Sequence, residues 1–283
     1  MKIRNIRAQK VTKTVARLCQ EANYFLPNDV HRALKQAHKT EESPLGRQTL
    51  DQILANAQLA TETKMAMCQD CGIAVVYLEI GQDTHITGGN LYEAINEGVR
   101  QGYEQGYLRK SMVRRPYSAR VNTQDNTPAV IHTDIIPGDK LKITVMPKGG
   151  GSENMSRLFM LTPEQGRSGI IEVVLRAVNE AGSNPCPPVI VGVGIGGTAE
   201  IAMALAKKAT LRPLGSTNSD PENVRLEKEL TKRVNALGIG PEGLGGQTTA
   251  LAVHIELFPS HIASLPIAVS LQCHAARQKE AIL

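Results

Sequence analysis

Two cysteines separated by two residues form the motif with the most evident chemical potential in this chain. Cys68 and Cys71 enclose Gln69 and Asp70 in the segment MCQDCG, and an apolar run follows directly. A C-x-x-C pair can be a redox dithiol, half of a zinc site or part of an iron–sulfur site. A thioredoxin-like dithiol is expected after a strand and at the start of a helix. Here the strand-like run follows the motif, which disfavours that function.

Three cysteines at predicted strand ends are the residues from which a metal site could be built. Cys68 precedes the apolar run 72–81, Cys186 stands between prolines in SNPCPPV, and Cys273 ends the run SLPIAVSLQC. If they converge, three thiolates with one open position suit catalytic zinc, or a four-iron cluster whose open iron acts as a Lewis acid. A single cysteine is more often a small buried apolar residue, which we expect for Cys19. Spacing alone leaves these alternatives open.

A glycine triplet is the second feature that could bind a ligand. Gly149, Gly150 and Gly151 follow Lys148 directly at the end of a predicted strand. Three glycines raise the entropy cost of folding, and the usual compensation is a close approach of the backbone to another group. One interpretation is therefore an anionic ligand that also contacts the lysine, and the other is a flexible hairpin turn.

The segment GVGIGG, residues 192–197, matches the dinucleotide-binding pattern G-x-G-x-x-G between a strand and a helix. The helix is followed by LRPLGSTNSDP, which is not a second parallel strand. No acidic residue stands at a strand end about 20 residues on, where a ribose ligand belongs. We therefore predict no NAD binding. Close packing of strand on helix is the favoured interpretation, and a carboxylate at the helix N-terminus is the other.

Helices and short strands interleave along the chain, and they must position these residues. Helical patterns cover most of 5–65, then 88–110, 163–182, 220–240 and the last ten residues, and residues 187–209 are predicted as a strand, a glycine turn and a helix. Strand patterns cover 72–81 and the segments SARVN, PAVIHTDIIPGD, KLKITVMPKGGG, TTALAVHIELF and SLPIAVSLQC. No regular βαβ repeat is present, so the predicted fold class is α/β in the mixed, α+β sense. We expect one region over 1–283, with a helical part over about 1–65 and mixed sheets flanked by helices over about 66–283.

Composition excludes several function classes. Hydrophobic residues make up 41% and charged residues 21%, as in globular proteins. Aromatic residues make up only 3%, with no Trp, so we predict no nucleic-acid binding by base stacking. No apolar run approaches the roughly 20 residues of a membrane helix. The five cysteines lack disulfide-framework spacing, which indicates a reducing cytoplasm. The net charge of +5 is compatible with a small anionic substrate.

Six segments together carry a resemblance to a known family. They are MCQDCGIAVVYLEIG, LRKSMV, KGGGSENMS, NPCPPVIVGVGIGGTAE, GIGPEGLGGQTTALAVHIE and HIASLPIAVSLQCHAARQ. The chain resembles the α subunit of class I, iron–sulfur-dependent fumarate hydratases, and the related two-subunit tartrate dehydratases. These enzymes reversibly add water to the C=C bond of a dicarboxylate with an oxygen-sensitive [4Fe-4S] cluster. The resemblance implies Cys68, Cys186 and Cys273 as the cluster ligands.

The same resemblance implies roles around the substrate. Gln69, Arg109 and the loop made of Lys148, Gly149, Gly150 and Gly151 are implied to bind the dicarboxylate. Asp70 and His261 are implied to move or order the proton of the reacting water. Each residue keeps an ordinary structural alternative, which is a surface cation for Arg109, a satisfied loop histidine for His261 and a cap for Asp70.

The resemblance also predicts a partner and a substrate. In single-chain relatives the base for the C3 proton lies in a C-terminal domain beyond the third ligand motif. We therefore expect a separate β subunit in an α2β2 assembly. The family usually has Thr where this chain has Cys71, so Cys71 is expected beside the cluster, with a ligand swap from Cys68 as the alternative. KGGGSENMS and CHAAR favour fumarate. An L-tartrate dehydratase α subunit and a non-catalytic zinc or thiol scaffold are the other candidates.

Overall fold

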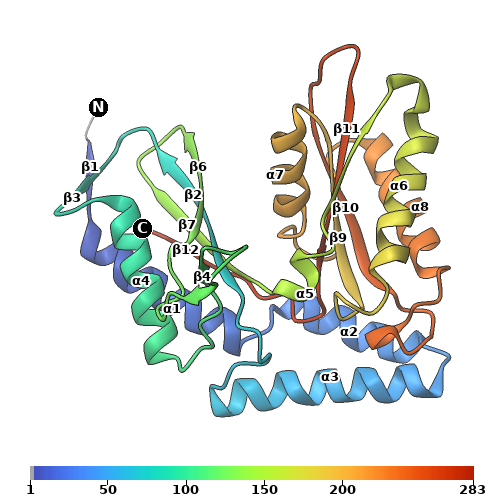
Figure 1. Ribbon diagram of the computed structural model, residues 1–283, viewed down its shortest axis with the longest axis horizontal. Coiled ribbons are helices and arrows are strands. Elements are labelled where there is room, and N and C mark those ends of the chain that lie inside the picture. Colours follow the sequence, from blue (N-terminus) through green and yellow to red (C-terminus); the bar gives the residue numbers. More distant parts are fainter. Residues whose placement is uncertain (1–2) are drawn as a thin grey trace. The chain divides into compact units, whose positions relative to one another are not determined.

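The computed structural model describes residues 3–283, and its elements are shown in Figure 1. The chain forms two compact units. The first unit comprises residues 3–27, 57–150 and 277–283, and the second unit comprises Asn28–Asn56 and Gly151–Ala276. Each unit contains helices and a mixed four-stranded sheet, which confirms the predicted mixed α/β fold class. The expected division at about residue 65 stays a prediction.

The first unit is built on a sheet with the strand order β12-β7-β2-β6. The strands of this sheet are β2 (Ile73–Gly81), β6 (Val130–Ile136), β7 (Leu141–Lys148) and β12 (Lys279–Ile282). The unit also contains the helices α1 (Ala8–Tyr24) and α4 (Leu91–Gln105). Two short strand pairs complete it, β1 (Arg4–Arg7) with β3 (Thr84–Thr87) and β4 (Val113–Arg114) with β5 (Val121–Asn122). β2 runs parallel to β6 and antiparallel to β7. This pairing places the start of β2 beside the end of β7.

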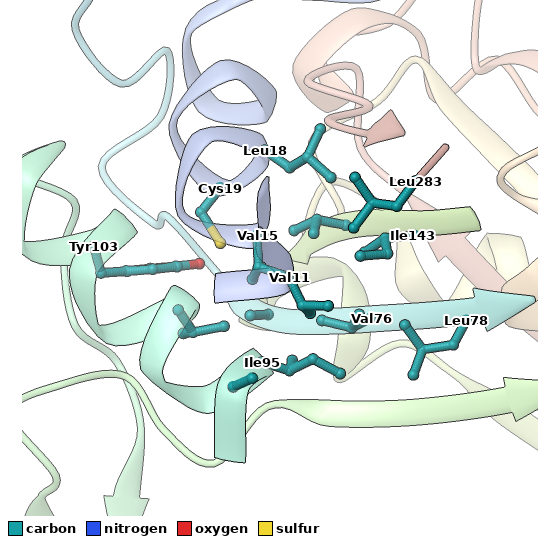
Figure 2. Packing of buried hydrophobic residues seen from close by; sticks show 14 of the residues in the cluster. Val11, Val15, Leu18, Cys19, Val76, Leu78, Ile95, Tyr103, Ile143 and Leu283 are labelled. Atoms are coloured by element: carbon teal, nitrogen blue, oxygen red, sulfur yellow. The ribbon is translucent and has the colours of Figure 1, made fainter. Parts of the chain in front are cut away.

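The core of the first unit lies between this sheet and the helix pair α1 and α4. Figure 2 shows side chains that meet there. They come from α1, α4, β2 and β7, with Leu283 from the segment after β12, and include Val11, Val15, Leu18, Val76, Leu78, Ile95, Tyr103 and Ile143. The two helices approach closely because α4 carries glycines at the contact. A Cβ atom on Gly98 would lie 2.7 Å from the Thr12 carbonyl oxygen, and one on Gly102 would lie 2.7 Å from the Ala16 carbonyl oxygen.

The chain end differs from the sequence expectation. The last ten residues were predicted to be helical, and this prediction is wrong because β12 adds to the edge of β7 as an antiparallel strand. The backbones of Leu141 and Leu283 exchange hydrogen bonds of 3.1 and 2.8 Å. Sheet hydrogen bonds and burial of Leu283 outweigh a weak local helical pattern. Residues 5–65 are mostly helical as predicted, although residues 5–7 belong to β1.

The second unit has a sheet with the strand order β10-β9-β11-β8. Its strands are β8 (Arg157–Leu161), β9 (Val189–Gly196), β10 (Ala250–Phe258) and β11 (Leu265–Gln272). Its helices are α2 (Asn28–Thr40), α6 (Gly166–Ala181), α7 (Ala199–Ala209) and α8 (Pro221–Asn235), with short 3-10 helices at Pro163–Gln165 and Pro241–Gly243. The one-turn helix α5 (Gly150–Glu153) begins at the last residue of the first unit's segment 57–150. A further helix, α3 (Pro44–Thr63), begins in this unit. Figure 1 shows α7 on one face of the sheet and α6 and α8 on the other.

Close packing explains the G-x-G pattern of β9. A Cβ atom on Gly192 would lie 2.0 Å from the Ala206 carbonyl oxygen, and one on Gly194 would lie 2.0 Å from the Ala202 carbonyl oxygen. Since both carbonyls belong to α7, these glycines let the helix lie directly on the strand, and the packing interpretation is confirmed. No helix within residues 3–283 combines the length and apolarity that a membrane crossing requires.

Candidate active site

The loop before β2 brings Asp70 to Gly149 and Gly150, the two glycines of the triplet that belong to the first unit. The Gly150 N–H donates to Asp70 Oδ2 at 2.6 Å, and the Gly72 N–H donates to Asp70 Oδ1 at 3.0 Å. These contacts follow from the register of the sheet, which pairs Ile73 with Lys148. Gly72 has a φ of +75°, and a Cβ atom there would lie 2.7 Å from the Lys148 nitrogen. The predicted carboxylate and the predicted glycine loop therefore share one site, although the Gly72 bond also fits the structural alternative of a local turn.

The glycine backbone lies close to the Asp70 carboxylate. A Cβ atom on Gly149 would lie 3.3 Å from Asp70 Oδ2, so a larger residue would press on the carboxylate. Lys148 ends β7 with only 1% of its surface exposed. Gly151 belongs to the second unit, where a Cβ atom would lie 2.9 Å from the Asn184 carbonyl oxygen. All three glycines thus stand where a backbone or carboxylate oxygen comes close.

A buried arginine that the sequence analysis did not single out holds the Asp70 loop. Arg277 is 1% exposed, and its Nη1 donates to the Asp70 carbonyl oxygen at 2.6 Å and to Asn23 Oδ1 at 3.1 Å. A Cβ atom on Gly149 would lie 3.4 Å from Arg277 Nη2. Nε and Nη2 have no hydrogen-bond partner within the described part of the chain. In the sequence, Arg277 is the last residue of the segment CHAAR, and no local sequence pattern indicates that an arginine is buried.

The two cysteines of the C-x-x-C motif have different surroundings. Cys68 is half-buried, and its Sγ lies 3.5 Å from Gln69 Oε1. Cys71 is 2% exposed and packs in the core of the first unit. Its Sγ accepts a hydrogen bond from the Arg109 N–H at 3.2 Å and lies 3.7 Å from the Cys68 carbonyl oxygen. Burial raises the pKa of the Cys71 thiol, and the Arg109 N–H only partly offsets this.

Two of the three predicted ligands lie in adjacent segments of the second unit. β11 runs antiparallel to β9, so the end of β11 lies beside the start of β9, where Gln272 pairs with Ile190. Cys273 follows β11 and Cys186 precedes β9, and the His274 N–H donates to the Cys186 carbonyl oxygen at 3.3 Å. Cys273 is 9% exposed, whereas Cys186 is exposed. The strand pairing therefore places the two segments that carry Cys186 and Cys273 side by side, although they are distant in sequence.

The third predicted ligand belongs to the other unit. Cys68 lies in the first unit, and Cys186 and Cys273 lie in the second. Within residues 3–283, no three His, Cys, Asp or Glu residues are grouped as a metal site. The three-cysteine ligand set therefore stays a prediction.

Two predicted substrate-contacting side chains are exposed on the first unit, and one catalytic candidate lies elsewhere. Gln69 and Arg109 are both exposed. His261 lies in the loop between β10 and β11 and lines a surface cavity of about 470 Å³, together with residues such as Asp220 and Ser260. His261 precedes β11 and Cys273 follows it, so a strand of roughly 25 Å separates them, at ~3.3 Å per residue. The second unit does not bring His261 to its two cysteines.

Known proteins resemble this chain over most of its length. The sequence profile of the family described as fumarate hydratase (Fumerase) matches residues 12–282. The chain is 43% identical over 273 residues to the putative L(+)-tartrate dehydratase subunit alpha of Methanocaldococcus jannaschii, covering 95% of this chain and 96% of that protein. It is 34% identical over 273 residues to the L(+)-tartrate dehydratase subunit alpha of Escherichia coli K12, covering 95% of this chain and 89% of that protein.

Proposed function

The chain belongs to the fumarate hydratase family of hydro-lyases, and on this premise we propose that it is the α subunit of an iron–sulfur enzyme that reversibly hydrates fumarate to (S)-malate. The observation that carries the proposal is the hydrogen bond from His274 to the Cys186 carbonyl, which joins two segments that each bear a thiol. Relatives named as alpha subunits support a partner β subunit. We further propose that this subunit completes the active site and that the assembly is α2β2.

The proposed cofactor is a [4Fe-4S] cluster held by Cys68, Cys186 and Cys273. The donor set fits this group, because three thiols without a fourth ligand leave one iron open. Two of them are carried by adjoining loops, and Cys68 lies half-buried beside Gln69 rather than in the core. When bound, the cluster would supply an open iron that acts as a Lewis acid toward the hydroxyl and one carboxylate of the substrate. Such thiols suit a reducing cytoplasm.

The residues of this chain would bind and orient the dicarboxylate. Gln69 and Arg109 are exposed, so they are able to reach a carboxylate from solvent, and each charge-assisted hydrogen bond contributes about 1.5–3 kcal/mol. Asp70 is the proposed acid or base for the reacting water. The Gly150 and Gly72 N–H groups fix the direction of its carboxylate before the substrate binds. Lys148 adds positive charge at the same loop.

The proposed role of His261 rests on the resemblance alone. Its Nδ1 accepts the Ala263 N–H at 3.1 Å, which fixes the ring within its own loop. A His261→Asn variant tests the role: a loss of turnover with an unchanged cluster content supports it, and full activity contradicts it.

L-tartrate dehydration is the second candidate, because the relatives reported above carry that name. Both reactions interconvert a C4 hydroxy-dicarboxylate with a dehydrated product, so the site described here suits either. Anaerobic co-production with a β subunit, followed by assays with fumarate, (S)-malate and L-tartrate, separates them. A kcat/KM for fumarate at least about tenfold above that for L-tartrate supports fumarate hydration, and the reverse order supports the second candidate.

Cluster chemistry is tested before any turnover is measured. Anaerobic reconstitution of the purified chain with iron and sulfide should yield a brown protein with broad visible absorption. A colourless chain that binds zinc in place of iron would contradict the proposal and support the scaffold alternative.

A further inference from the structure

A glycine-rich turn of the second unit, residues 240–246, contacts both loops that carry a predicted ligand. Pro187 follows Cys186 directly, and its carbonyl oxygen accepts the Glu242 N–H at 2.7 Å. The side chain of the same residue reaches the other loop, since Glu242 Oε1 lies 2.7 Å from His274 Nε2, one residue after Cys273. One glutamate therefore binds the neighbours of both cysteines.

The backbone at this glutamate is unusual for its residue type. Glu242 has φ +52° and ψ 15°, a left-handed conformation that glycine adopts at less cost than glutamate. Four glycines with positive φ surround it in the turn. A glutamate retained in such a turn indicates a function for its side chain, since the backbone alone favours a fifth glycine.

The turn itself is held against the Cys186 loop. A Cβ atom on Gly243 would lie 2.3 Å from Ser183 Cβ, so only glycine allows this approach. The Ser183 carbonyl oxygen accepts the Cys186 N–H at 3.0 Å, which makes Ser183 part of the same loop. Without the Glu242 carboxylate, the turn thus packs on the Cys186 loop and hydrogen-bonds it through the Glu242 N–H, whereas the Cys273 loop is reached by the carboxylate.

We propose that Glu242 is a positioning residue, which through His274 and Pro187 holds the Cys186 and Cys273 loops in a fixed arrangement before any metal binds. Its carboxylate accepts the His274 ring N–H, while its backbone N–H holds the Pro187 carbonyl. The His274 N–H to the Cys186 carbonyl closes the connection between the loops. That the two thiols so placed receive an iron–sulfur cluster rests on the proposed function, whereas the placement of the loops does not.

The experiment measures how readily the two thiols are bridged in the full apo chain. Dibromobimane becomes strongly fluorescent only when both of its bromomethyl carbons have alkylated thiols, with the loss of two bromide ions and two protons. Peptide mapping by mass spectrometry assigns the bridged pair to Cys186 and Cys273. The rate of formation of this product reports the time-averaged approach of the two loops, without iron, substrate or a β subunit.

Three variants of the same residue separate the side chain from the backbone. Glu242→Ala removes the acceptor, and Glu242→Gly removes it while suiting the left-handed backbone, so the second variant keeps the test informative if the first folds poorly. Glu242→Gln keeps an oxygen that accepts the His274 N–H. The control is Glu180→Ala, which removes an exposed carboxylate of the same unit that lies 3.9 and 4.0 Å from Arg157 and Arg176.

Bridging should slow about tenfold in Glu242→Ala and Glu242→Gly, the factor expected when one charge-assisted hydrogen bond is lost. Glu242→Gln should stay within about twofold of the parent chain, and Glu180→Ala should be unchanged. Equal rates in the parent and Glu242→Gly chains would overturn the proposal. So would a Gln variant as slow as Ala, or a parent chain that forms no Cys186–Cys273 product.

Iron binding in the same preparations distinguishes this inference from the proposed function. A parent chain that binds no iron but shows Glu242-dependent bridging leaves the positioning role intact and removes the proposed cofactor. A chain that binds iron but bridges at a rate independent of Glu242 supports the proposed cofactor and removes the positioning role. Retention of iron after reconstitution should follow the bridging rate, with Glu242→Gln rescued relative to Glu242→Ala.

Discussion

Glu41 holds the end of the glycine-rich turn 240–246, and its removal gives the sharpest stability prediction. The residue directly follows α2 and is 0% exposed. Its carboxylate accepts the N–H groups of Gln247 and Thr248 at 2.9 Å each and that of Ser43 at 3.1 Å. A Cβ atom on Gly246 would lie 2.7 Å from Glu41 Oε1. Glu41→Ala therefore leaves three backbone donors without their acceptor.

The expected magnitude follows from these three donors. Each buried N–H left unsatisfied costs about 1–3 kcal/mol, and water entering the space of the lost side chain reduces the sum toward the lower end. We expect Glu41→Ala to lower the free energy of unfolding by about 3 kcal/mol. For a unit of this size that corresponds to a fall in Tm of roughly 6–12 °C. Glu41→Gln keeps one acceptor oxygen and should cost about half as much.

The same contacts predict a pH dependence. Burial would raise the pKa of Glu41, but the N–H groups of Gln247, Ser43 and Thr248 outweigh it, and the pKa lies below its ordinary value of 4.5. A carboxyl group with a lowered folded pKa stabilises the protein above its unfolded pKa, and this stability is lost as pH falls through the folded pKa. The difference between the parent chain and Glu41→Gln should therefore be full near pH 7 and shrink below about pH 4.5.

Urea denaturation of the full chain at several pH values provides the assay. Glu42→Ala is the matched control, because Glu42 is the adjacent glutamate and is exposed. The reasoning is refuted if Glu41→Ala and Glu42→Ala differ by less than about 0.5 kcal/mol, the usual range of surface substitutions. A loss in Glu41→Gln that stays constant from pH 7 to pH 4 would refute the electrostatic part alone.

Three further outcomes are expected. Gln272 is 2% exposed, and neither polar atom of its side chain has a hydrogen-bond partner among residues 3–283. Gln272→Met should therefore raise the unfolding free energy of the apo chain by about 1 kcal/mol. A loss of stability in this variant would contradict the prediction. Gly192→Ala should lower the yield of folded protein and its unfolding free energy by about 3 kcal/mol, since the new methyl group would lie 2.0 Å from the Ala206 carbonyl oxygen; a neutral result in thermal unfolding would show that α7 moves freely. After anaerobic reconstitution, Cys68→Ser should lose bound iron while Cys71→Thr keeps it; full iron content in Cys68→Ser would remove Cys68 from the ligand set.

Elements with strong local signals were predictable from the sequence. Asp220 followed by Pro221 is a typical start of a helix, and in the structure the Asp220 side chain accepts the Glu222 N–H at 2.8 Å and Pro221 begins α8. Gly182 ends α6 with a φ of +53°. The strand at the chain end was not predictable, because its reason is the free edge of β7 rather than any preference of residues 279–282.

The site was predictable in its residue types but not in its connections. The approach of Asp70 to Gly150 depends on the register between β2 and β7, and the approach of Cys186 to Cys273 depends on the antiparallel pairing of β9 with β11. A pattern within one segment carries no information about which strand lies next to it. Glu242 was missed for the same reason, since its importance lies in contacts with two loops that are distant in sequence.

The C-x-x-C motif illustrates how a local pattern can mislead. Cys71 Sγ accepts the Arg109 N–H and lies near the Cys68 carbonyl oxygen, and a threonine hydroxyl, one acceptor and one donor of similar size, can satisfy the same two groups. The threonine that the family resemblance leads us to expect here would therefore keep both contacts. The spacing of the two cysteines then reflects a tight turn before β2, in which Cys71 packs into the core while Cys68 faces partly outward. A motif scan counts both as thiols, but only their surroundings show that one belongs to the core and the other to the proposed site.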